Sequence, residues 1–200
     1  MAADEVYVDP AINADSGAGT IGDPYGDLEY AMEQSSLGTD GTRFNIKSGT
    51  AEVLEFALDP ITDVGSPLNT RPIIFQGYDS AAGDGGKGEI SGGGSVSIID
   101  LTTADYLHFI DLKMGNCGSA DLLDVDDWCS LVRCELHGSN SAGSAIEMGS
   151  YCVVAECYFH SMDGAGLDFL LEFSSNNIAM YNHFVHSNGG VCIRGARTSY

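Results

Sequence analysis

The sequence predicts an all-β fold in which short strands stack as successive coils of a parallel β-helix. Three observations support this: a repeat of 22 to 25 residues, alternating apolar and polar residues within each repeat, and polar or glycine-rich bends between the alternating segments. Two columns display the repeat. They are Leu112, Cys134, Cys157 and Asn182, and, two residues further on, Met114, Leu136, Phe159 and Phe184. A period of this length, with one apolar strand renewed in each turn, is typical of a solenoid.

Other repeat architectures fit this pattern poorly. Helical repeats would need runs of ten or more residues with apolar positions every three to four residues, and the sequence has none. Leucine-rich repeats would need leucine and asparagine at constant sites, which are also absent. The coils begin at about Pro72, and Val191 with Ile193 starts the last one.

The first part of the chain predicts a different structure. EVYVDP alternates as a strand, and Phe44 with Ile46 marks another. Between them, Asp23 as cap and Pro24 in the first turn predict a short amphipathic helix to about Gln34. A helix across the end of a solenoid would cover its core and its unpaired strand edge. We therefore expect residues 1–60 to form an N-terminal cap and residues 61–200 to form the β-helix coils.

The charge of the chain restricts its partners. Its 29 acidic and 8 basic residues give a net charge of −21, which repels nucleic acid and anionic membrane surfaces. No apolar stretch is long enough to insert into a membrane, and the N-terminus has neither a basic region nor an apolar run. We therefore expect synthesis in a cytoplasm, without a secretion signal.

The six cysteines lie between Cys117 and Cys192. Four of them form two pairs at the repeat period, Cys129 with Cys152 and Cys134 with Cys157. We expect buried free thiols rather than disulfides, because cysteine packs as a small apolar residue and cytoplasmic thiols stay reduced. No Cys-x-x-Cys pair is present, which argues against a zinc site.

Alternation around the clearest strand also predicts outward-facing side chains. Asp111, Arg133 and Glu156 then lie on neighbouring coils, as do Lys113 and Glu135, which favours stabilising ion pairs between coils. The functional alternative is a small sugar-binding face. Its residues would be Glu156, Tyr158, Tyr181 and His183.

Clustered carboxylates, recurring histidines and one glycine-rich loop are further candidates for a functional site. Carboxylates gather at Asp124, Asp126 and Asp127, and at Asp163, Asp168 and Glu172. Such pairs serve glycosidases and would suit calcium, although no spacing demands either. His137, His160 and His186 recur after the same strand, where a turn-stabilising role is favoured over a metal site. The loop AAGDGGKGE lacks the residues of a phosphate-binding loop.

Several segments resemble right-handed, single-stranded parallel β-helix proteins of the pectate-lyase type. YVDPAINADSGAGTIGDPYGDLEYAMEQ resembles their N-terminal cap, which contains one short α-helix, and RPIIFQGYDSAAGDGGKGEISG is similar to their first coil. WCSLVRCELHGSN and YCVVAECYFHSMDGAG look like their coils. The resemblance implies the fold but not one activity, because it extends to polysaccharide lyases, glycoside hydrolases, adhesins and phage tailspike or fibre proteins.

The expected function is that of a structural virion protein, a phage fibre, spike or decoration component that presents a β-helix surface for assembly and host glycan attachment. Its partners would be other virion proteins, further copies of itself, for example in a homotrimer, and a cell-surface polysaccharide. The sequence ends shortly after a new coil begins, with no apparent C-terminal cap, so we expect a covering partner there. The alternative is a polysaccharide lyase or glycoside hydrolase. The lyases combine calcium with an arginine or lysine base, which would make Arg133 and Glu156 the candidate catalytic residues, although Asp111 and Glu156 more simply neutralise Arg133.

Overall fold

The computed structural model describes residues 4–12, 15–139, 144–162, 169–187 and 191–195. Its two helices are α1 (Leu28–Glu33) and α2 (Pro60–Asp63). Its strands are β1 (Asp4–Val8), β2 (Thr42–Lys47), β3 (Ala51–Val53), β4 (Ile73–Tyr78), β5 (Gly88–Ser91), β6 (Ile99–Leu101), β7 (Leu107–Ile110), β8 (Leu112–Gly118), β9 (Leu123–Val125), β10 (Ser130–Val132), β11 (Glu135–Ser139), β12 (Ser144–Met148), β13 (Val153–Ala155), β14 (Tyr158–Met162), β15 (Phe169–Phe173), β16 (Ile178–Met180), β17 (His183–Ser187) and β18 (Val191–Gly195).

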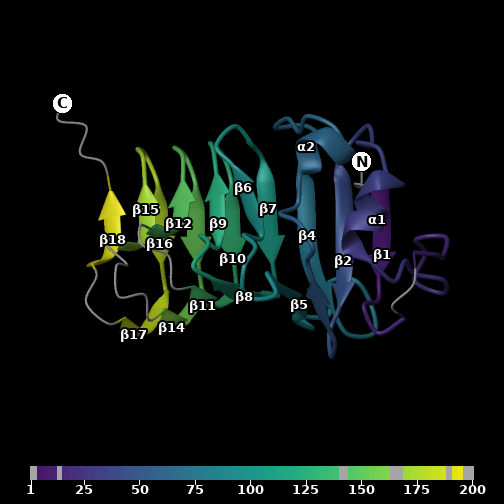
Figure 1. Cartoon of the computed structure of the whole chain (residues 1–200). Helices are drawn as coiled ribbons and strands as arrows, with labels where there is room; N and C mark the ends of the chain where they lie inside the picture. Colours follow the sequence, from purple (N-terminus) through teal and green to yellow (C-terminus); the bar gives the residue numbers. More distant parts are fainter. Residues whose placement is uncertain (1–3, 13–14, 140–143, 163–168, 188–190, 196–200) are drawn as a thin grey trace.

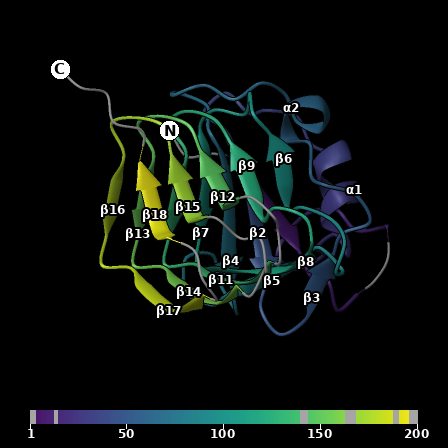
Figure 2. The ribbon, with the colours of Figure 1, turned by 60° about the vertical axis from the view of Figure 1, so that its left-hand side comes forward.

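These strands form three parallel sheets, and from β4 onward the chain visits each sheet once per coil. The sheet orders are β1-β2-β4-β7-β10-β13-β16, β3-β5-β8-β11-β14-β17 and β6-β9-β12-β15-β18. Figures 1 and 2 show the coils stacked into a rod, with α1 at one end and β18 at the other. The prediction of a parallel β-helix is thus confirmed.

Strand register confirms the repeat. Lys113 pairs with Glu135, Glu135 with Tyr158, and Tyr158 with His183, which are steps of 22, 23 and 25 residues. Inside the rod, side chains of successive coils lie in columns. Phe44, Phe75 and Phe109 stack with ring centroids 5.6 and 5.4 Å apart.

The predicted capping helix is present, but it begins later than expected. Its N-cap is Asp27, whose carboxylate accepts a hydrogen bond of 2.7 Å from the Tyr30 amide. The prediction of Asp23 as cap and Pro24 in the first turn was wrong, because this segment is extended and Tyr25 bridges to Val8 of β1. The helix still buries Leu28, Ala31 and Met32 against the core.

The second helix was not predicted. Asp59 caps α2 by accepting from the Thr62 amide, and Pro60 occupies its first turn. This is the same Asp-Pro signal that the sequence analysis assigned to residues 23 and 24. Strands β1, β2 and β3, all before residue 60, join the same sheets as the later coils. No helix in the described part of the chain is both long and apolar enough to cross a membrane.

The cysteine columns are buried in the core, as predicted. Cys129 and Cys134 donate through Sγ to carbonyl oxygens of the preceding coil, at 3.3 and 3.4 Å. Burial raises the pKa of Cys117 to about 11. On the coil after Cys152 and Cys157, the corresponding positions are occupied by Asn177 and Asn182. The amide of Asn182 accepts from the Cys157 backbone and donates to Val154, both at 2.9 Å, so this polar residue joins two coils where cysteine had packed.

Candidate functional site

On four successive coils, a sharp corner leads from the first sheet into the second, and each of these corners is occupied by a residue named from the sequence. These residues are Asp111, Arg133, Glu156 and Tyr181, all with left-handed backbone φ between 52 and 57°. The prediction that they face outward from within a strand needs correction, because each is the residue that follows a strand. Left-handed backbone costs energy in non-glycine residues, and hydrogen bonds between coils hold the corners in place.

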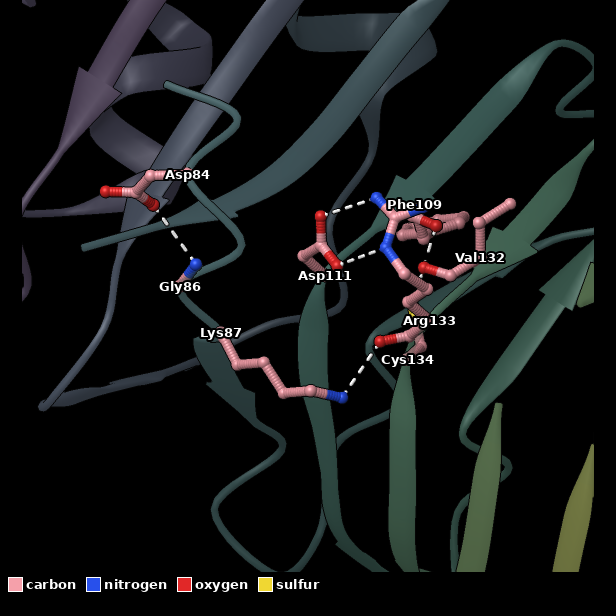
Figure 3. A network of polar contacts seen from close by, with 8 residues as sticks. All are labelled: Asp84, Gly86, Lys87, Phe109, Asp111, Val132, Arg133 and Cys134. Atoms are coloured by element: carbon pink, nitrogen blue, oxygen red, sulfur yellow. Dashed lines mark hydrogen bonds and ion pairs between the residues drawn. The ribbon is translucent and has the colours of Figure 1, made fainter. Parts of the chain in front are cut away.

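Arg133 is tied to its neighbouring coil by a bidentate ion pair (Figure 3). Its Nε and Nη2 donate to the two carboxylate oxygens of Asp111, each at 2.7 Å, and the Asp111 side chain is almost completely buried. Lys87 Nζ donates to the Arg133 carbonyl oxygen at 2.9 Å. The guanidinium therefore neutralises a buried carboxylate, which favours a structural role for Arg133 over that of a catalytic base.

We expect Arg133→Ala to lower the free energy of unfolding by about 2 kcal/mol, because it leaves the Asp111 carboxylate buried without its partner. Urea denaturation monitored by circular dichroism measures the loss. Lys113→Ala is the control, since its partner Glu89 lies 3.5 Å away and is far more exposed than Asp111, so this ion pair should contribute less than about 1 kcal/mol. Equal losses in the two variants would contradict the structural role of Arg133.

The predicted sugar-binding face is only partly assembled. Tyr158 stacks on His160 at 4.7 Å and lies 5.3 Å from His183, between ring centroids. Tyr181 projects from its corner with 84% of its surface exposed. His160 Nε2 is 3.1 Å from a carboxylate oxygen of Glu135. The structure thus places Tyr158 and His183 together, whereas Tyr181 stands apart at the corner.

The histidine column does not include all three predicted members. His137 and His160 stack with ring centroids 5.4 Å apart, but strand register places Val185, and not His186, beside His160. Within the described part of the chain, no three His, Cys, Asp or Glu side chains are grouped so that they could hold a metal ion.

The glycine-rich loop before β5 is organised by an internal carboxylate. Asp84 accepts hydrogen bonds from the amides of Asp79, Ser80, Ala81 and Gly86, and these bonds hold its pKa well below the usual range. Four amides of this loop are therefore already occupied by its own carboxylate.

A second corner, from the third sheet into the first, carries an aromatic ladder that the sequence analysis missed. It consists of Tyr106, Trp128 and Tyr151, with φ of 52, 62 and 60°. Tyr106 and Trp128 stack at 6.3 Å, and Trp128 and Tyr151 at 4.3 Å with ring planes only 6° apart. Trp128 and Tyr151 are 45% and 46% exposed. Their steps of 22 and 23 residues follow the repeat and could have been found from it.

Next to this aromatic ladder, outward carboxylates form an acidic ladder on the third sheet. Strand register aligns Asp100, Asp124, Glu147, Glu172 and Arg194 on successive coils. Adjacent parallel strands are about 4.8 Å apart, so the carboxylates repel one another. The repulsion is relieved at one end, where Arg194 lies 3.3 Å from Glu172.

This crowding changes the protonation of the ladder. Burial, with the charges of Glu147 and Asp100, raises the pKa of Asp124 to about 6. Burial and the Glu172 charge also raise the pKa of Glu147. Glu172 accepts a hydrogen bond of 2.7 Å from Ser144. Asp124 can therefore hold a proton at mildly acidic pH.

A cavity of about 260 Å³ lies along the acidic ladder, and its lining extends to Asp126 and Gly149, each two residues before a member of the aromatic ladder. Its lining includes Thr102, Asp124, Asp126, Glu147, Gly149 and Ser174. Of the carboxylates named from the sequence, Asp124, Asp126 and Glu172 line this cavity, whereas Asp127 accepts a hydrogen bond from the Ser150 amide. Asp163 and Asp168 lie outside the described residues. The cavity and the aromatic ladder together combine ring surfaces, carboxylates and hydroxyl groups.

Comparison with known protein families, with curated protein sequences and with solved structures finds no match for this chain.

Proposed function

We propose that the chain is a structural component of a virion fibre or spike and that it attaches to a host glycan through the aromatic ladder and the adjoining cavity. The observation that carries the glycan part is the exposed stack of Trp128 and Tyr151 on hydrogen-bonded corners. Aromatic rings that stay partly exposed in a well-ordered position offer apolar surface to the C–H groups of a sugar ring.

Tyr151, at the end of the aromatic ladder, offers the most suitable surface for contact with a sugar ring. One face of Tyr151 is covered by Trp128, and on the next coil Asn176 occupies the corresponding corner. A sugar ring would pack on the other face of Tyr151. Nearby Ser150 and Ser175, whose hydroxyl groups are 3.0 Å apart, would supply hydrogen bonds. The net charge of −21 favours a neutral or basic glycan over an acidic one.

Rod-like stacking supports the virion part of the proposal. Coils about 4.8 Å apart present side chains at regular intervals along an elongated surface, which suits a polymeric ligand. The resemblance of the coil sequences to phage fibre and tailspike proteins points in the same direction. Immunogold labelling of purified particles with an antibody against the chain tests this part, and labelling confined to cell debris would reject it.

The glycan part is tested by binding to an array of neutral, amino-sugar and acidic oligosaccharides, followed by calorimetry with the best ligand. We expect Tyr151→Ala to weaken binding roughly 5- to 150-fold, because stacking of a flat ring on one aromatic side chain contributes about 1–3 kcal/mol in the comparable case of nucleic-acid bases. Tyr181→Ala is the matched control, since this tyrosine is exposed at the other corner. Unchanged binding by Tyr151→Ala would reject the ladder, and loss on Tyr158→Ala instead would locate the site on the sequence-predicted face.

One observation favours glycoside hydrolysis as a second candidate. Asp124, with its pKa raised to about 6, neighbours Glu147 in register, and retaining glycosidases hold an acid and a nucleophile about 5 Å apart. Reducing ends released from a bound glycan, and lost in Asp124→Asn but not in Asp100→Asn, would establish this activity. Binding without product would leave attachment as the function.

A further inference from the structure

A carboxylate occupies the first position of an otherwise apolar column in the core. Glu52 of β3 pairs in register with Ile90 of β5, and Ile90 pairs with Met114 of β8. The later members, Leu136 and Phe159, are completely buried. Because side chains at paired positions share one face of a sheet, Glu52 points into the rod beneath the capping helix. Figure 2 shows β3 near α1 at this end of the molecule.

The surroundings of Glu52 are unfavourable for a negative charge. The residue is only 5% exposed, and its Oε2 atom has no hydrogen-bond partner. The charged groups that face it are Asp27 at the start of α1 and Glu29 within α1, and both are acidic. Beside it lies a cavity of about 520 Å³ between the start of α1 and β3, to which Glu55 adds another carboxylate. None of the described residues that line this cavity is basic.

We propose that Glu52 is a pH-sensitive latch, which holds α1 against β3 while its carboxyl group is protonated and loosens this contact when the group ionises. The ionised group needs water, and the cavity that Glu52 itself lines offers water a route to the carboxylate. Movement of α1 would widen that route, at the cost of exposing Leu28, Ala31 and Met32, which the helix now buries.

The direction of the pH response follows from the protonation equilibrium. Burial, followed by the charge of Asp27, raises the pKa of Glu52 from 4.5 to about 7, although the Leu28 amide opposes the shift. The closed arrangement therefore binds the proton more tightly than an open, hydrated one. The latch is strongest below about pH 4.5, weakens as pH rises, and reaches a constant, weaker level above about pH 7.

Hydrogen exchange at the α1 amides tests the proposal. After correction for intrinsic exchange, we expect the opening constant of α1 to rise roughly 70-fold between pH 5 and pH 8, as two pKa values of 4.5 and about 7 require. In Glu52→Gln, which keeps the shape but not the charge, the constant should change less than threefold. Glu55→Gln is the matched control, because Glu55 lines the same cavity, and it should retain the wild-type response.

A direct titration makes the test independent of the variants. Carbon-detected NMR of the wild-type protein should show the Glu52 carboxyl group titrating near pH 7. A midpoint below pH 5 would overturn the proposal, as would an equal pH response of α1 exchange in the wild type and Glu52→Gln.

Discussion

Phe75→Ala is expected to lower the free energy of unfolding by about 4 kcal/mol. The Phe75 ring is completely buried and is the middle member of a stack, in contact with Phe44 on one side and Phe109 on the other. Its removal forfeits the transfer free energy of the ring and leaves a cavity that two neighbouring coils cannot both close, because their backbones are held by parallel strand pairing.

Urea denaturation measures this loss, with Phe56→Ala as the matched control. Phe56 is 73% exposed, so truncating it should change the free energy of unfolding by less than about 0.5 kcal/mol. A loss below about 1.5 kcal/mol for Phe75→Ala would show that the coils can collapse around the missing ring, which contradicts a closely packed core.

Gly77→Ala is the second change with a large expected effect, a loss of more than about 3 kcal/mol or failure to fold. A Cβ at this position would lie 2.0 Å from the carbonyl oxygen of Asp111 and 2.4 Å from backbone atoms of Gly86 and Gly88. All three are main-chain atoms, so no side-chain rotation can make room. The corner at Asp111 packs directly against this glycine.

The matched control is Gly22→Ala. A Cβ there meets no atom within 4 Å, so the change should alter stability by less than about 0.5 kcal/mol. Soluble yield and thermal unfolding distinguish the two variants. A stable, cooperatively folding Gly77→Ala protein would contradict the close approach of successive coils at this corner.

Much of the fold follows from local patterns. Alternation identified the strand of Met114 and its counterparts, and the repeat identified their neighbours on other coils. Both signals are strong because a strand has a side-chain period of two and each coil must renew the same apolar face. The start of α1 was misplaced because two Asp-containing signals, at Asp23 and Asp27, compete within five residues.

The candidate functional site was harder to predict from the sequence than the fold. Charge alone marked Arg133 as a candidate, whereas in the structure it neutralises the buried Asp111. Trp128 and Tyr151 were overlooked because their positions are corners, where alternation carries no information and left-handed backbone is unusual for aromatic residues. His186 was assigned to a column that register gives to Val185, since the last step is 25 residues and not 26.

The amino-acid order was thus sufficient for the strands, their period and the burial of the cysteines, because these depend on neighbours a few residues apart or on one repeated spacing. The contacts between side chains of neighbouring coils, in contrast, could be identified only from the three-dimensional structure. Coil lengths vary and a register shift occurs between His137 and Ser139, so contacts between coils depend on backbone hydrogen bonds formed after the chain has turned. The aromatic ladder and the burial of Glu52 beneath α1 both arise at that level.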